Sequence, residues 1–225
     1  ALNTPMPLRD RILATRAERA GSCLPMLQLE ETPTGELGIA LEAPCQPRTP
    51  FKIMVNTLTA DVVTDAKGRW EQRIPGLAPE IAVSIQLGKH TRSERLDLSD
   101  RTAKQLVALA WHGPQTFFIR PETAPSGSEE GLGQVIRVGT GIGAAFEVFS
   151  SSPGEDRAAG IVRLSVDALV TEENCGKNVS TQAYQTSYLG DLRPTEIAYT
   201  MPDCDRVGDV VRLQNLLRDM RLASR

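Results

Sequence analysis

The residues with the clearest chemistry in this chain are its four cysteines, Cys23, Cys45, Cys175 and Cys204. They form two clusters of similar layout, one toward each end of the sequence. In each cluster an Ile-Ala run leads through a proline to a cysteine, and an asparagine follows that cysteine eleven residues later. Four cysteines allow three pairings, and the repeat favours one disulfide per cluster, Cys23–Cys45 and Cys175–Cys204. Such bridges would indicate an oxidising compartment.

Other uses of the cysteines remain open at the level of the sequence. Four reduced, buried thiols would indicate a cytosolic protein. A zinc site is disfavoured, because no Cys-x-x-Cys is present and the only histidines, His90 and His112, are not in ligand spacing. A redox-active thiol would need an accessible cysteine of lowered pKa, which no Cys-x-x-Cys here supports.

The asparagines of the two clusters, Asn56 and Asn215, each interrupt an apolar run. A polar residue in such a run can satisfy buried backbone groups near the cysteine loop. We interpret both as structural polar residues rather than as ligand-binding residues.

Candidate catalytic residues are few. The chain has no Gly-x-Ser-x-Gly elbow for a nucleophilic serine. His112 follows Trp111 at the end of an expected strand, and with the Glu129–Glu130 loop it could form a carboxylate-based hydrolase site. A turn histidine is the favoured interpretation of His112, and Trp111 and Trp70 are expected to pack in the core or at an edge.

A glycine-rich segment at 139–144 formally matches a dinucleotide-binding pattern. That loop holds a pyrophosphate only where a helix N-terminus follows it. Here the strand-like run 146–149 and a Pro-Gly turn follow, so the segment predicts a β-hairpin, and we expect no cofactor.

Composition narrows the class of protein. The net charge of −3 argues against a nucleic-acid surface. No apolar run approaches the roughly 20 residues of a membrane-spanning helix. Aromatic residues make up only 4% of the chain, so the core must consist mainly of aliphatic side chains. The chain begins at Ala1 rather than Met, from which we expect a removed leader or an upstream membrane anchor, with a trimmed chain as the alternative.

Period-two alternation predicts strands over most of the chain. It is clearest at 51–55, 81–87 and 161–168, where the last strand is expected to have one solvated face. The charged stretch 89–104 predicts a linker or exposed excursion, and the tail 218–225 a frayed end. Only the segment 8–20 has helix formers and a glycine stop, which predict a short N-terminal helix.

The sequence Thr64-Asp65-Ala66-Lys67-Gly68-Arg69-Trp70, between alternating runs, resembles the hairpin of bacterial immunoglobulin-like modules of cell-surface proteins. The resemblance covers about residues 35–88 and implies a β-sandwich, without naming a ligand. The paired Ala-Pro-Cys and Pro-Asp-Cys elements are also similar to uncharacterised exported proteins of alphaproteobacteria, and this similarity implies no activity.

Together these patterns predict a mostly β protein made of two related β-sandwich-like halves with a short N-terminal helix. The expected parts are a helix or stalk at 1–22, a β domain with the first cysteine pair at 23–95, and a β domain with the second pair at 96–225. The favoured function is a non-enzymatic periplasmic or secreted module for binding, assembly or scaffolding, with a protein or another envelope component as its partner. The hydrolase near His112 is the alternative.

Overall fold

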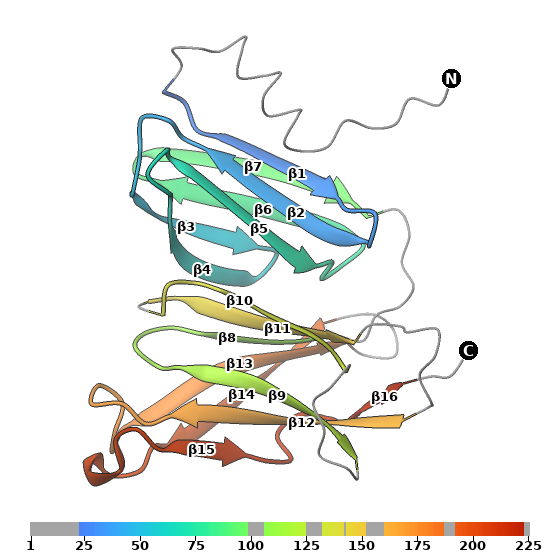
Figure 1. The fold of residues 1–225 in the computed structure, drawn as a ribbon, viewed down its shortest axis with the longest axis vertical. Coiled ribbons are helices and arrows are strands. Elements are labelled where there is room, and N and C mark those ends of the chain that lie inside the picture. The colour runs from blue at the N-terminus through green and yellow to red at the C-terminus, as the bar shows by residue number, and fades with distance from the viewer. Residues whose placement is uncertain are drawn as a thin grey trace. The chain divides into compact units, whose positions relative to one another are not determined.

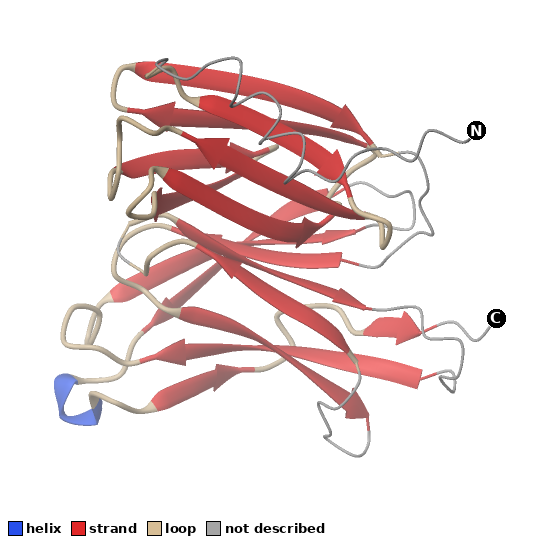
Figure 2. Cartoon of the chain, turned by 45° about the horizontal axis from the view of Figure 1, so that its top comes forward, coloured by secondary structure: helices blue, strands red, loops and turns tan. Residues whose placement is uncertain are grey.

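Strands make up almost all of the described structure. The computed structural model describes residues 23–98, 106–124, 132–141, 143–151, 160–186 and 192–222. These residues form strands β1–β16 and one short 3-10 helix, Cys204–Arg206 (Figure 2). The prediction of a mostly β protein is therefore confirmed, whereas the expected N-terminal helix lies outside the described residues. No helix in the described ranges is long and apolar enough to cross a membrane.

The chain divides into two compact units. Unit 1 comprises Ala1–Thr57 and Val62–Asp100, and unit 2 comprises Leu58–Asp61 and Arg101–Arg225. The domain boundary expected between residues 95 and 96 falls inside strand β7, which ends at Asp97.

Unit 1 has two antiparallel sheets that give it a β-sandwich-like build (Figure 1). One sheet has the order β1-β2-β5, and the other has the order β4-β3-β6-β7. Alternating aliphatic side chains of both sheets are buried, because successive side chains of a strand point to opposite faces. The strands of these two sheets are β1 (Met26–Glu31), β2 (Glu36–Glu42), β3 (Pro50–Val55), β4 (Leu58–Val63), β5 (Arg69–Pro75), β6 (Glu80–Leu87) and β7 (His90–Asp97). Leu58–Asp61 of β4 are grouped with unit 2.

The linker predicted over 89–104 is wrong for its first half. Strand β7 pairs with β6 along its whole length, from His90 opposite Leu87 to Asp97 opposite Glu80. Most of its side chains are exposed on either face. Backbone pairing with β6 therefore keeps this charged segment in a strand. The segment has no apolar alternation from which the strand could be predicted.

Unit 2 also has two antiparallel sheets (Figure 1). The larger has the order β10-β11-β8-β13-β14, and in the smaller β12 lies centrally, paired with β9 on one side and with β15 and β16 on the other. Buried side chains from both sheets form one hydrophobic cluster, which includes Trp111 and Phe117. The strands are β8 (Leu106–Trp111), β9 (Phe117–Ala124), β10 (Gly133–Val138), β11 (Ala145–Ser151), β12 (Gly160–Leu169), β13 (Asn178–Thr186), β14 (Leu192–Thr200), β15 (Val210–Leu213) and β16 (Met220–Leu222).

Two local predictions in unit 2 are wrong for part of their residues. The tail contains β16, which pairs with β12 and buries Met220 in the core, so the chain is ordered there rather than frayed. The expected solvated face of β12 is present at Ile161 and Arg163, which are exposed. It is covered at Ser165 and Asp167, which are 5% and 1% exposed. Arginine side chains from the neighbouring strands bond to Asp167 and exclude water from it.

The glycine-rich segment links β10 to β11, which pair with Val138 opposite Phe146. A strand rather than a helix follows the glycines, so the hairpin prediction is confirmed. The segment therefore lacks the helix N-terminus on which a dinucleotide site depends.

Both disulfides have the predicted pairing, Cys23–Cys45 and Cys175–Cys204. All four cysteines are in these bridges, which leaves no free thiol for the alternative interpretations. Each bridge joins the two chain ends of an antiparallel hairpin. In unit 1 these are the ends of β1 and β2, where Met26 is opposite Glu42. In unit 2 they are the ends of β13 and β14, where Asn178 is opposite Thr200.

Candidate functional site

The turn between β4 and β5 is the best-defined loop of unit 1. Asp65 organises it, because the Lys67 and Arg69 amides donate to Asp65 Oδ1 at 2.7 and 2.8 Å. The Gly68 amide donates to the Asp65 carbonyl at 3.0 Å, and the Asp65 amide donates to the Arg69 carbonyl at 2.7 Å. Aspartate is favoured at such positions because its side chain accepts from backbone amides within the turn.

This turn is joined to the loop that carries Cys45. The Ala43 amide donates to the Gly68 carbonyl at 2.7 Å, and Thr64 Oγ1 donates to the Gln46 carbonyl at 2.7 Å. Gly68 has a φ of +73°, and a Cβ there would lie 2.0 Å from the Ala43 carbonyl oxygen. The hairpin motif thus bonds the Asp65 turn to the Cys45 loop. Only glycine fits at position 68, where the two backbones meet.

A surface hollow of about 310 Å³ lies beside this turn, lined by Val63, Asp65, Arg69, Trp70 and Glu71. Its volume is at the lower end of the range found for small-ligand pockets. The two strands that flank it, β4 and β5, are the outermost strands of the two sheets of unit 1. The hollow therefore lies where the Asp65 turn connects an edge strand of one sheet to an edge strand of the other.

Charge in the hollow is organised by one ion pair. Arg69 Nη2 lies 3.0 Å from Asp65 Oδ2, with the two side chains 40% and 43% exposed. The Arg69 amide lowers the pKa of Asp65, and the Lys67 amide and the Arg69 guanidinium lower it further against a desolvation effect. Asp65 is consequently a carboxylate at neutral pH.

Trp70 is one of the residues that line the hollow, and it is half-buried. Its ring meets Phe51 edge to face, with centroids 5.6 Å apart and an interplanar angle of 86°. Phe51 is buried in the core, so it holds the Trp70 ring in place. The expectation that Trp70 packs at an edge agrees with this position, and the contribution of Trp70 to a hollow was not foreseen.

The asparagines of the two cysteine clusters occupy turns with left-handed backbone, at φ values of 52° for Asn56 and 61° for Asn215. Asparagine tolerates this conformation better than most residues. The Ala82 amide donates to Asn56 Oδ1 at 2.8 Å, so this side chain satisfies a backbone group of β6. Asn215 is exposed in the segment between β15 and β16.

The described chain contains only part of the alternative hydrolase site. Trp111 is 2% exposed and meets Phe117 in the core of unit 2, with ring centroids 5.8 Å apart. His112, the next residue, is exposed and is not among the residues that line the hollow. Glu129 and Glu130 lie outside the described residues.

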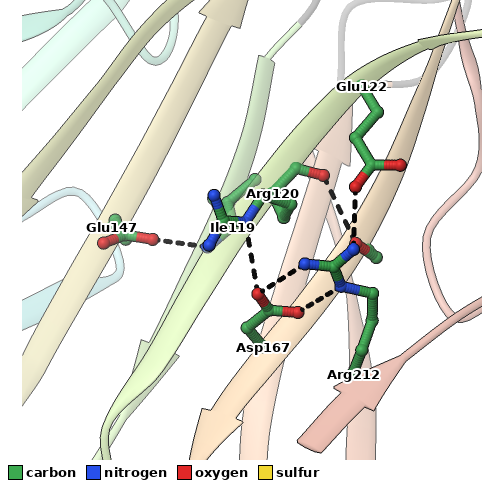
Figure 3. Close-up of polar contacts among 7 residues, drawn as sticks. Ile119, Arg120, Glu122, Glu147, Asp167 and Arg212 are labelled. Atoms are coloured by element: carbon green, nitrogen blue, oxygen red, sulfur yellow. Dashed lines mark hydrogen bonds and ion pairs between the residues drawn. The ribbon is translucent and has the colours of Figure 1, made fainter. Parts of the chain in front are cut away.

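A charged network lies on β9, β12 and β15 of unit 2, and Figure 3 shows it. Arg212 Nε donates to Asp167 Oδ1 at 2.8 Å, and Arg120 Nε donates to Asp167 Oδ2 at 3.2 Å. Arg212 also donates to Glu122 Oε1 at 2.9 Å. Burial by itself would raise the pKa of Asp167, but the bonds from Arg212 and Arg120 outweigh it and lower the pKa.

A second buried carboxylate, Glu147 on β11, bonds to the backbone of β9. It accepts from the Ile119 amide at 2.5 Å (Figure 3), and Arg137 Nε donates to its other oxygen at 3.1 Å. Arg137 also donates to the Phe117 carbonyl. Burial raises the pKa of Glu147, against the opposing effects of Ile119 and Arg137. Glu147 and Arg137 thus bond to one backbone amide and one backbone carbonyl on an edge of β9, as the backbone of a paired strand would.

Neither charged group of unit 2 was foreseen from the sequence. Asp167 and Arg212 are 45 residues apart, and Ile119 and Glu147 are 28 apart, so no local spacing links them. The Asp65–Arg69 pair, by contrast, lies within a recognisable turn motif. Within the described ranges, no group of three or more His, Cys, Asp or Glu residues could hold a metal ion.

Comparison with known proteins supplies no family for this chain. No family model, no curated protein and no solved structure matches it.

Proposed function

We propose that this chain is a non-enzymatic binding module of an oxidising extracytoplasmic compartment, periplasmic or secreted, that serves binding, assembly or scaffolding in the cell envelope. The observation that carries the proposal is the pair of disulfides, one in each unit. Structural disulfides of this kind persist outside the reducing cytosol. Its partner is a protein or another envelope component, and the hollow beside the Asp65–Gly68 turn is the position where we place the contact.

The order of elements supports two related modules. In both, a cysteine precedes an antiparallel hairpin, a proline and a second cysteine follow it, and a strand then leads to an asparagine with left-handed backbone. The Asp65 turn and the paired sheets of unit 1 support an immunoglobulin-like module of the kind found on bacterial cell surfaces.

The compartment is tested by non-reducing peptide mapping of the protein exported to the periplasm. We expect the linked peptides Cys23–Cys45 and Cys175–Cys204 in nearly all of the protein. Four free thiols in that oxidising setting would contradict the proposal.

Binding is tested in the same cells with a photo-crosslinking amino acid in place of Lys67, an exposed residue of the Asp65 turn. The matched control carries it in place of Glu94, an exposed residue of β7. We expect adducts from position 67 and none from position 94. Equal yields at the two positions, or none at 67, would count against a contact at this turn. Nothing in the described part of the chain favours the hydrolase alternative.

A further inference from the structure

Among the described residues, β5 pairs only with β2, so its other edge presents backbone groups beside the hollow. The Ala43 amide bonds to the Gly68 carbonyl on the β2 side, and the Arg69 carbonyl faces the opposite side, where it accepts from Asp65. Backbone groups alternate in direction along a strand, so those of Glu71 and Arg73 also face away from β2. The Arg73 carbonyl accepts from Gln72 Nε2 at 3.1 Å, which leaves Glu71 and the Arg73 amide for pairing with an extended chain.

The hollow that adjoins this edge has an excess of negative charge. Its charged side chains are two carboxylates, Asp65 and Glu71, and one guanidinium, Arg69. The Arg69 guanidinium is bound to Asp65. Glu71 is exposed and has no ion-pair partner among the described residues. The uncompensated charge of the hollow is therefore that of Glu71, which favours a cationic group.

Val63 adds an apolar surface to the hollow, because its side chain is 43% exposed. Such a surface can contact the aliphatic stem of an arginine or lysine whose charged group lies at the carboxylate. Trp70 precedes Glu71 on β5, so its side chain points to the opposite face of the sheet, where its ring meets the buried Phe51.

We propose that an extended peptide segment binds this edge of β5 as an added strand and places an arginine or lysine side chain in the hollow, against Glu71. This proposal rests on the proposed binding function and names its ligand class. Backbone pairing with Glu71 and Arg73 supplies the orientation, and the hollow supplies the selectivity for a basic side chain.

The test uses the intact, oxidised protein and a set of end-blocked pentapeptides, Thr-Val-Xaa-Val-Thr, in which Xaa is Arg, Lys, Gln or Glu. Binding is followed by isotope-edited NMR of the β5 amides. We expect the Arg and Lys peptides to bind at least about tenfold more tightly than the Gln peptide, with shifts confined to β5, the Asp65 turn and β4. The Glu peptide should bind more weakly still.

The Glu71→Lys variant reverses the charge at an exposed position that the fold does not depend on. We expect it to lose the preference for Arg and to favour the Glu peptide, whereas the matched Glu94→Lys variant on β7 keeps the original preference.

The absence of binding by the Arg peptide at about 1 mM would overturn the proposal. So would equal binding of the Arg and Gln peptides, or an unchanged preference in Glu71→Lys. These results would leave the disulfide map and the crosslink from position 67 unaffected, so failure of the peptide hypothesis is distinguishable from failure of the proposed function. Adducts from position 67 with no peptide binding would indicate a ligand of another class, such as a glycan.

Discussion

Two buried carboxylates of unit 2 have pKa values displaced in opposite directions, and the difference arises from their partners. Asp167 receives bonds from two arginines and its pKa is lowered. Glu147 has one arginine and one amide, its burial dominates, and its pKa is raised. The two residues therefore couple stability to pH with opposite signs.

Removing the Asp167 carboxylate should destabilise the protein. We expect Asp167→Asn to lower the free energy of unfolding by about 2 kcal/mol at pH 7, because Arg120 and Arg212 lose a buried anionic acceptor. Since the native pKa is lowered, this contribution is present above about pH 3.9 and is lost as pH falls through the native pKa. Urea denaturation at pH values from about 2 to about 7, which span the titration of carboxylates, measures this contribution.

The exposed pair Arg206–Asp209 provides the control for this prediction. Asp209→Asn should cost less than about 1 kcal/mol, as exposed ion pairs do. An Asp167→Asn loss no larger than that of the control would show that the network contributes little to stability.

Glu147 should show the reverse dependence. Its native pKa is raised, so the wild-type stability due to this group is greatest below about pH 4.3 and falls as pH rises through the native pKa. We expect the stability difference between wild type and Glu147→Gln to shift in favour of the variant as pH rises. Denaturation curves at matched pH values measure the trend, and a difference that is constant or moves in favour of wild type would contradict it.

At the scale of elements, the contact between the Asp65 turn and the Cys45 loop depends on one glycine. Gly68→Ala should cost at least about 2 kcal/mol, because a left-handed residue acquires a Cβ and that Cβ collides with the Ala43 carbonyl. Gly88→Ala, at a φ of +57° with nothing within 4 Å, isolates the backbone cost of about 1 kcal/mol. Chemical denaturation of both variants measures the difference, and equal losses would show that the two loops separate easily.

At the scale of the whole molecule, the two disulfides lie in different units. Replacing either cysteine pair by alanines should lower the free energy of unfolding by about 3 to 4 kcal/mol, since loops of separation 22 and 29 are released. The losses should add in the variant lacking all four cysteines, within about 0.5 kcal/mol, because each bridge constrains a different unit and independent sites are additive.

A thermodynamic cycle of the two double variants and the fourfold variant measures this additivity. If the fourfold variant is unfolded without denaturant, a stabilising osmolyte brings all four proteins into the measurable range, since such solutes are excluded from the exposed surface. A coupling well above 0.5 kcal/mol would show that the bridges stabilise a shared structure.

Local patterns in the sequence were sufficient to predict several features of the fold. Period-two alternation in 81–87 identified β6 because one face of that strand is buried. The repeated cysteine spacing identified both bridges, because each closes the ends of a hairpin formed by neighbouring segments. The glycines at 139–143 indicated a hairpin because a strand-like run rather than a helical one follows them.

Tertiary structure alone decided the rest. Strand β7 has no apolar alternation, and its pairing with β6 is a backbone interaction that side chains do not encode. The alternation of β12 predicts a solvated Asp167, but in the fold Arg120 and Arg212, from two other strands, bond to its carboxylate. The hollow likewise requires two sheet edges to meet beside Trp70, and no spacing along the chain reveals that meeting. The sequence determined which alternating segments form strands and which cysteines pair, because those are local properties. The charged network and the hollow arise from residues brought together from different strands, so only the fold could place them.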